Sequence, residues 1–120
     1  MADPQTVDSR IRGALHPLVE NVEKGAYRGS AKTYIVFGYN TIPYCFGDDE
    51  PEYEKYLIWV RLVAPITQKI TGLVREIKEA LEAADFPWPS STPSTDDEGS
   101  KQNVLFETEW VEAIGGEDDV

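Results

Sequence analysis

The sequence has few of the residues that disulfide-bonded proteins, metalloproteins and many enzymes depend on. Its 120 residues include one cysteine, Cys45, and one histidine, His16. A single cysteine excludes an intrachain disulfide and a cysteine-based metal site, and it is typical of an intracellular protein. No apolar run reaches the roughly 18 residues that span a bilayer. The N-terminal stretch MADPQTVDSR also lacks the apolar core of a signal peptide.

Basic residues are also scarce. There are 11 Lys and Arg against 22 Asp and Glu, which gives a net charge of -11. Such a surface repels phosphate backbones, so general or specific nucleic-acid binding is not expected. Many acidic proteins are simply soluble, and the charge by itself names no partner. The 41% hydrophobic and 28% charged composition is that of a globular chain. We predict one domain over residues 1–120, with mobile tails at 1–5 and 115–120.

No catalytic constellation is visible in the sequence. His16 stands beside Pro17, with no nucleophile motif near it. Cys45 is followed by acidic residues, which raise a thiol pKa instead of activating it. The acidic runs 48–52 and 95–99 lack the ligand spacing of an EF-hand loop. We therefore predict no catalytic, cofactor-binding or metal-binding residue and no enzyme. A subunit whose active site is completed by a partner chain stays an alternative.

Two stretches have helical periodicity. Apolar residues predict an amphipathic helix over 5–23, although Pro17 should kink or split it. The second helix is predicted over 67–86, ending before Pro87. Its apolar stripe comprises Ile70, Leu73, Val74, Ile77, Leu81 and Ala84.

Three stretches have the composition and alternation of strands. They are 32–40, 54–65 and 103–113, and the Pro- and Ser-rich stretch between Pro87 and Gln102 has room for a short edge strand. Both faces of 54–65 are largely apolar, so we expect it at the centre of a sheet and covered on most of both sides. The expected fold is α+β, in the order α-β-β-α-(β)-β. Two main helices then pack on a small, mostly antiparallel sheet.

This architecture predicts which side chains form the core. The predicted buried residues are Ile35, Phe37, Ile58, Val60, Leu73, Ile77, Leu81, Phe106 and Trp110.

The stretch between the first two predicted strands is long and unusual. Residues 40–54 are read as a connection that combines aromatic and acidic side chains. Hairpin loops usually have about 2–5 residues, so a connection of this length indicates a surface that contacts other subunits. Rigid aromatics are common anchors of such interfaces. The predicted interface residues are Tyr39, Tyr44, Phe46, Asp48, Asp49, Glu50 and Tyr53.

The order of these segments resembles a known class of virion proteins. From Arg10 to Ala113 the chain presents IRGALHPLVENV, YIVFGYN, the acidic aromatic connection, YLIWVRLVA, ITGLVREIKEALEAADF, STDDEGSKQ and NVLFETEWVEA. This layout is similar to that of the tail terminators and neck-region tail-completion proteins of long-tailed phages. The resemblance is one of element order and carries no diagnostic residue.

The resemblance implies a structural protein of a phage or prophage. Such a protein forms a hexameric ring that caps the tail tube and docks the head, and its free form can be monomeric. Its partners are the tail tube protein and a head-completion protein. DNA passes through the ring without specific binding, and neither a membrane nor a cofactor is involved. It is found in the host cytoplasm during assembly and then in the tail-neck region of the virion. Alternatives are a head-closure or adaptor protein, or a small acidic binding or inhibitor protein.

Overall fold

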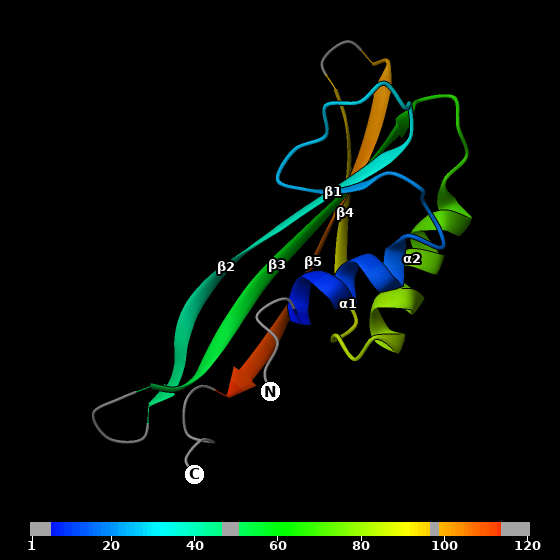
Figure 1. Ribbon diagram of the computed structural model, residues 1–120. Helices are drawn as coiled ribbons and strands as arrows, with labels where there is room; N and C mark the ends of the chain where they lie inside the picture. Colours follow the sequence, from blue (N-terminus) through cyan, green and yellow to red (C-terminus); the bar gives the residue numbers. More distant parts are fainter. Residues whose placement is uncertain (1–5, 47–50, 97–98, 114–120) are drawn as a thin grey trace.

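The computed structural model describes residues 6–46, 51–96 and 99–113. In this part of the chain, two helices accompany one sheet of five strands in the order β1-β2-β3-β5-β4 (Figure 1). The elements are α1 (Thr6–Leu15), β1 (Val22–Lys24), β2 (Tyr34–Phe46), β3 (Pro51–Pro65), α2 (Thr71–Ala83), β4 (Ser90–Thr95) and β5 (Lys101–Ala113). The predicted α+β class is confirmed. The predicted mobile tails, 1–5 and 115–120, lie outside the described residues.

The sheet is mostly antiparallel, as predicted. β3 lies at its centre and pairs antiparallel with β2 on one side and β5 on the other. β4 pairs antiparallel with β5 and forms one edge of the sheet, which suits a strand that contains Pro93. The exception is β1, which pairs parallel with β2 through Val22↔Ile35. The sequence analysis did not predict this short strand.

The predicted helix over 5–23 is wrong in its second half. α1 ends at Leu15, and the chain turns through residues 16–18. Pro17 lacks the amide hydrogen that a continuing helix needs, and it disfavours helical geometry at His16. Val19 and Val22 are still buried, but from the turn region and β1 instead of a helix.

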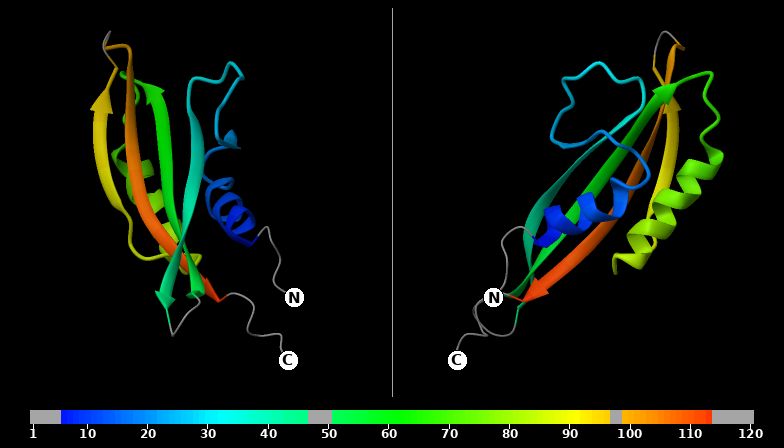
Figure 2. Two further views of the ribbon diagram at one scale, coloured as in Figure 1. Left: turned by 90° about the vertical axis from the view of Figure 1, so that its left-hand side faces the viewer. Right: turned by 45° about the vertical axis from the view of Figure 1, so that its right-hand side comes forward.

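Both helices pack on the same face of the sheet (Figure 2). Arg10 links α1 to the C-terminal end of α2, since it donates a hydrogen bond to the Ala84 carbonyl at 3.2 Å. The core cluster contains Val7, Ile11, Leu15, Val19, Val22, Ile35, Phe37, Ile58, Val60, Leu62, Ala64, Ile70, Ile77, Leu81, Phe86, Val104 and Phe106. Seven of the nine predicted core residues are buried, whereas Leu73 and Trp110 are only partly buried.

The predicted connection over residues 40–54 is largely strand. β2 continues to Phe46 and β3 begins at Pro51, in register from Thr41↔Tyr56 to Phe46↔Pro51. Pro43 is compatible with this strand because β1 pairs only with residues 35–37, so the outer edge of β2 has no strand beside it there. At most residues 47–50, which lie outside the described part, are left to connect the two strands.

The extended hairpin of β2 and β3 and the end of β5 form an arm that extends beyond the helices (Figure 1). We define the arm as residues 41–46, 51–56 and 110–113, which are joined by the β2–β3 and β3–β5 pairing. It makes the molecule elongated, with extents of 54 × 25 × 25 Å. No helix among the described residues has the length and apolar character that a membrane crossing requires.

Candidate interaction surface

The sheet face opposite the helices carries exposed apolar side chains. We call it the open face and define it by Ile42, Lys55, Leu57, Trp59, Arg61 and Val111. Ile42, Lys55 and Val111 stand side by side on three neighbouring strands. Ile42, Leu57 and Val111 are 40%, 41% and 40% exposed, respectively. The expectation that β3 is covered on most of both sides holds only in part. Val63 on this face is buried, but Leu57 and Arg61 are exposed because both helices pack against the other face.

Trp59 lies flat on the open face, across the neighbouring strand. Its cross-strand partner is Gly38, and a Cβ atom at Gly38 would come within 2.5 Å of the indole ring. Only glycine leaves room for this close approach. The Arg61 guanidinium lies 5.9 Å from the centre of the same ring. The centre of the open face is therefore a broad, partly exposed aromatic surface with a positive group at its margin.

Charged side chains lie among the apolar ones on the open face. Lys55 stands between Ile42 and Val111, and its Nζ lies 3.2 Å from Glu109 Oε1 on β5. A surface ion pair of this kind contributes at most about 1 kcal/mol to stability. The ion pair places charged groups beside the exposed apolar side chains, and such a mixture is typical of the margin of an interface.

Tyr39, one of the predicted interface residues, lies on the opposite face, towards α1. Its hydroxyl donates a hydrogen bond to Asp8 Oδ1 at 2.6 Å and accepts one from Lys24 Nζ at 3.1 Å. Lys24 Nζ also lies 3.3 Å from Asp8 Oδ2. Within one subunit, this polar triad of Asp8, Lys24 and Tyr39 fastens α1 to β1 and β2. A contact of Tyr39 with another subunit stays a prediction.

The polar triad shifts the protonation of two of its members. Burial raises the pKa of Tyr39 above its ordinary value of 10.0, and the hydrogen bond to Asp8 raises it further. The hydrogen bond with Tyr39 raises the pKa of Lys24 above its ordinary value of 10.5. Both groups therefore stay protonated through the neutral range, so their hydrogen bonds link α1 to the sheet throughout that range.

The remaining predicted interface residues belong to the hairpin. Tyr44 and Tyr53 are cross-strand partners, and Phe46 is paired with Pro51. Tyr53 is half-buried and alternates onto the same face as Lys55 and Leu57, so it extends the open face along the arm. The side chains of Tyr44 and Phe46, and residues Asp48, Asp49 and Glu50 as a whole, lie outside what the structure describes.

Ile42, Leu57 and Trp59 were not predicted as surface residues. Leu57 and Trp59 lie on β3, which is apolar on both of its alternating faces, and this pattern was interpreted as burial on both sides. Ile42 was assigned to the connection over residues 40–54.

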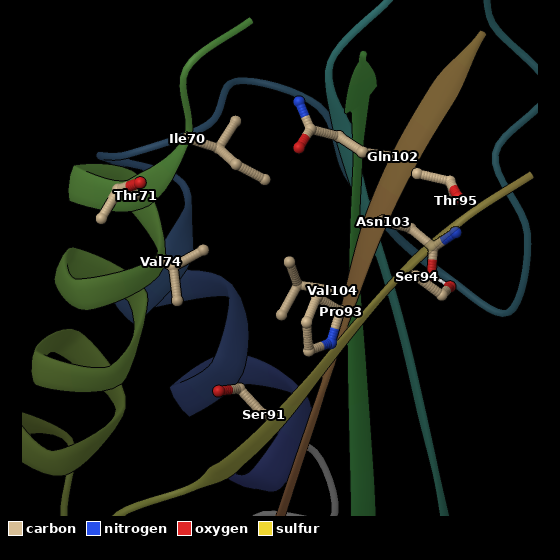
Figure 3. A pocket seen from close by; sticks show the side chains of 10 residues that line it. All are labelled: Ile70, Thr71, Val74, Ser91, Pro93, Ser94, Thr95, Gln102, Asn103 and Val104. Atoms are coloured by element: carbon tan, nitrogen blue, oxygen red, sulfur yellow. Dashed lines mark hydrogen bonds between the residues drawn. The ribbon is translucent and has the colours of Figure 1, made fainter. Parts of the chain in front are cut away.

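A cavity of about 430 Å³ separates the N-terminal half of α2 from β4 and β5 (Figure 3). Ile70 and Val74 of α2 face Pro93 and Val104 across it. The Gln102 amide at its end donates hydrogen bonds to the Pro65 and Gln68 carbonyls. Of the described residues that line the cavity, none is acidic, basic or histidine. Its lining therefore offers shape and apolar contact, without a general acid or base.

The described residues present no grouping suited to metal binding. Within these residues, no group of three or more His, Cys, Asp and Glu side chains comes together. His16 is exposed in the turn after α1. Cys45 belongs to β2, and the acidic run that follows it at 48–50 is outside the described part.

Comparison with known proteins establishes the fold and leaves the family open. No protein-family model matches the chain, and no curated protein matches it. A solved protein structure whose name states no function is similar to it, with a TM-score of 0.61 and 12% identity. The match covers 96% of this chain and 98% of the other. At this level of identity the likeness concerns the arrangement of helices and strands alone.

Proposed function

We propose that this protein is a structural virion component of a long-tailed phage or prophage, a tail terminator that assembles into a hexameric ring on the tail tube. The order of its elements resembles that class, as described above. In this proposal the protein is not an enzyme. It acts by presenting surfaces to copies of itself, to the tail tube protein and to a head-completion protein, first in the host cytoplasm and then in the virion neck.

The observation that carries this proposal is the open face. Soluble monomers rarely leave a contiguous apolar patch uncovered unless it binds something. Here Ile42, Leu57 and Val111 lie around Lys55 on three neighbouring strands. Trp59 follows Leu57 along β3, with Glu107 and Glu109 beside the two on β5. Aromatic and aliphatic residues ringed by charge are the usual composition of an interface core and its margin. A ring subunit needs such surfaces and no nucleophile.

The arm supports the same proposal in a second way. The three-stranded arm extends beyond the helices and presents exposed backbone edges, while Tyr56 and Trp110 at its base pack against the core. Edge strands of this kind are available for pairing with another chain. The arm also carries Tyr44, Phe46 and Tyr53, which the sequence analysis predicts as interface anchors.

The test is whether the protein self-associates through the open face. Concentrated protein would be studied by sedimentation velocity and by negative-stain electron microscopy. We expect ring-shaped particles, and we expect Leu57→Ser combined with Val111→Ser to abolish them. Ile66→Ser is the matched control, because Ile66 is 43% exposed but lies in the turn after β3. The control should assemble like the wild type.

The arm is tested separately. Tyr44→Ser combined with Phe46→Ser should leave the monomer folded by circular dichroism yet prevent ring formation. Unfolding of this variant would assign the arm aromatics to the core. A wild-type protein that stays monomeric at every concentration would contradict the ring and favour the alternative of a small acidic binding protein.

A further inference from the structure

A second cavity, of about 560 Å³, lies at the end of the sheet away from the arm. We call it the basic pocket. Lys32 and Lys101 line it together with Ser30, Ser100, Tyr27 and Tyr34, and none of the Asp and Glu residues that the structure describes does. Among the described residues, neither lysine has a carboxylate partner within ion-pair distance. In a chain with 22 acidic and 11 basic residues, such a lining is unexpected.

The wall of the basic pocket is held in place by Tyr27. Its ring stacks on Tyr34 with centroids 4.4 Å apart and planes inclined by 22°. Its hydroxyl accepts a hydrogen bond from the Ala31 amide at 2.8 Å. Gly29 packs so closely on the Tyr27 ring that a Cβ atom there would clash with it. The loop that carries Lys32 is therefore organised before any ligand arrives, which lowers the entropic cost of binding.

Asp96 precedes the pocket residues Ser100 and Lys101 in the sequence, and its carboxylate is already hydrogen-bonded. Asp96 accepts hydrogen bonds from the Ser100 amide at 2.9 Å, the Ser100 hydroxyl at 3.0 Å and the Lys101 amide at 3.3 Å. These bonds shape the turn that leads into β5. Asp96 thus orders the backbone beside Lys101 and is not one of the residues that line the pocket.

The other end of the molecule has the opposite charge. Glu54 and Glu112 are direct cross-strand partners on the arm. Like charges in this position are unfavourable within a sheet, and a cationic partner would relieve the repulsion between them. The adjoining sequence adds Asp48, Asp49, Glu50 and Glu52, whereas residues 24–47 contain Lys24, Arg28 and Lys32 and no acid.

The arm cannot reach the basic pocket of its own chain. β3 runs from Pro51 on the arm to Pro65, which lines the pocket. At about 3.3 Å per residue, a strand of this length separates its ends by about 45 Å. Paired on both sides by β2 and β5, β3 cannot fold back on itself. Contact between the two charged ends therefore requires two molecules.

We propose that the acidic end of the arm of one copy binds in the basic pocket of the next copy. The contact joins Glu54 and Glu112 to the neighbour's Lys32 and Lys101. It is head-to-tail, and head-to-tail contacts close into a ring when the rotation between copies allows. This inference rests on the proposed function, because it assumes self-association. It adds a contact distinct from the open face and sets the direction in which copies follow one another.

The test is a charge exchange followed by sedimentation velocity at low and high salt. The pocket variant is Lys32→Glu with Lys101→Glu, and the arm variant is Glu54→Lys with Glu112→Lys. Each alone should weaken self-association at least about tenfold, because like charges then face each other across the contact. An equimolar mixture of the two variants should recover self-association. The acidic arm of the pocket variant then meets the basic pocket of the arm variant, and the basic arm of the arm variant meets the acidic pocket of the pocket variant. High salt should weaken the wild-type contact.

The matched control for charge is Arg75→Glu with Lys78→Glu on α2, which changes net charge as much as the pocket variant does. Equal weakening by this control would overturn the inference, since general repulsion would then suffice. Failure of the mixture to recover assembly would also overturn it. If the pocket variant instead loses binding of inorganic phosphate or an oligonucleotide and assembles normally, the basic pocket is an anion site for another ligand.

The two proposals fail in different ways. Normal assembly of the pocket variant, with assembly still abolished by the Leu57→Ser and Val111→Ser changes, would reject the basic pocket contact and leave the ring intact. A wild-type protein that never self-associates would reject the proposed function, and the basic pocket contact with it.

Discussion

The two faces of the sheet are built from the same strands and have different surroundings. On one face, Ile58, Val60 and Leu62 of β3 lie beneath α1 and α2 and are almost completely buried. On the other, Leu57 is 41% exposed and Arg61 is at the surface. The alternation of β3 is apolar on both sides, so hydrophobicity alone does not decide which side becomes core. The deciding factor is which face the helices occupy.

The largest difference between the faces should appear in a matched pair of leucines. Leu81→Ala removes a fully buried side chain of α2 and should cost about 2–5 kcal/mol of unfolding free energy. Leu57→Ala on the open face should change it by about 0.5 kcal/mol or less. Urea unfolding of the monomer measures both. Equal losses would mean that the open face is part of a core.

A glycine on the open face should give the next largest effect. Gly38→Ala places a methyl group against the Trp59 ring, and such overpacking should cost about 1–3 kcal/mol. Unfolding by urea gives the cost, and tryptophan fluorescence should show Trp59 moving towards solvent. The same glycine change in a Trp59→Ala background should cost clearly less, because the clash is gone. If Gly38→Ala costs as much in the Trp59→Ala background as in the wild type, the loss comes from the backbone at residue 38 and not from a clash with the indole ring.

On the helix side, the polar triad offers a smaller and more specific test. Tyr39→Phe removes the hydroxyl that joins Asp8 and Lys24, which should cost about 1 kcal/mol. Denaturant unfolding measures it. Ser94→Ala is a suitable control because its hydroxyl bond to Asn103 is exposed. A loss no greater than that of the control would show that the triad does not fasten α1.

The smallest effect concerns pH. The pKa values of Tyr39 and Lys24 are raised in the folded state, so folding favours their protonated forms. Their contribution to stability should be complete below about pH 10 and should be lost as the pH rises further. Between pH 8 and pH 11.5, the free energy of unfolding should therefore fall less steeply for Tyr39→Phe than for the wild type. Parallel curves would contradict the raised pKa of Tyr39.

Elements with strong local periodicity were predictable. The apolar stripe of α2 predicted Leu73, Ile77 and Leu81 as core residues; Ile77 and Leu81 are buried, and Leu73 is partly buried. The alternation of β5 correctly placed Val104 and Phe106 on the inner face. Such patterns are readable because side-chain direction repeats every 3.6 residues in a helix and every two in a strand.

Segments governed by pairing with distant residues were misread. Residues 40–46 were assigned to the connection over 40–54 that combines aromatic and acidic side chains, yet pairing with β3 holds them as strand. Val22–Lys24 fitted a helical stripe, but Pro17 ends the helix and the chain then pairs with β2. Residues 41–46 contain β-branched and aromatic side chains that suit a strand, and pairing with β3 holds them in that conformation.

The candidate surfaces divide in the same way. The sequence by itself determined the composition: an acidic chain, aromatic residues near its hairpin, apolar residues on both faces of β3, and no catalytic constellation. Only the tertiary structure decided that Ile42, Leu57 and Val111 share one uncovered face and that Lys32 and Lys101 line one pocket. The physical reason is that periodicity fixes which side chains point the same way along one element. The packing of helices and the register between strands fix which elements meet.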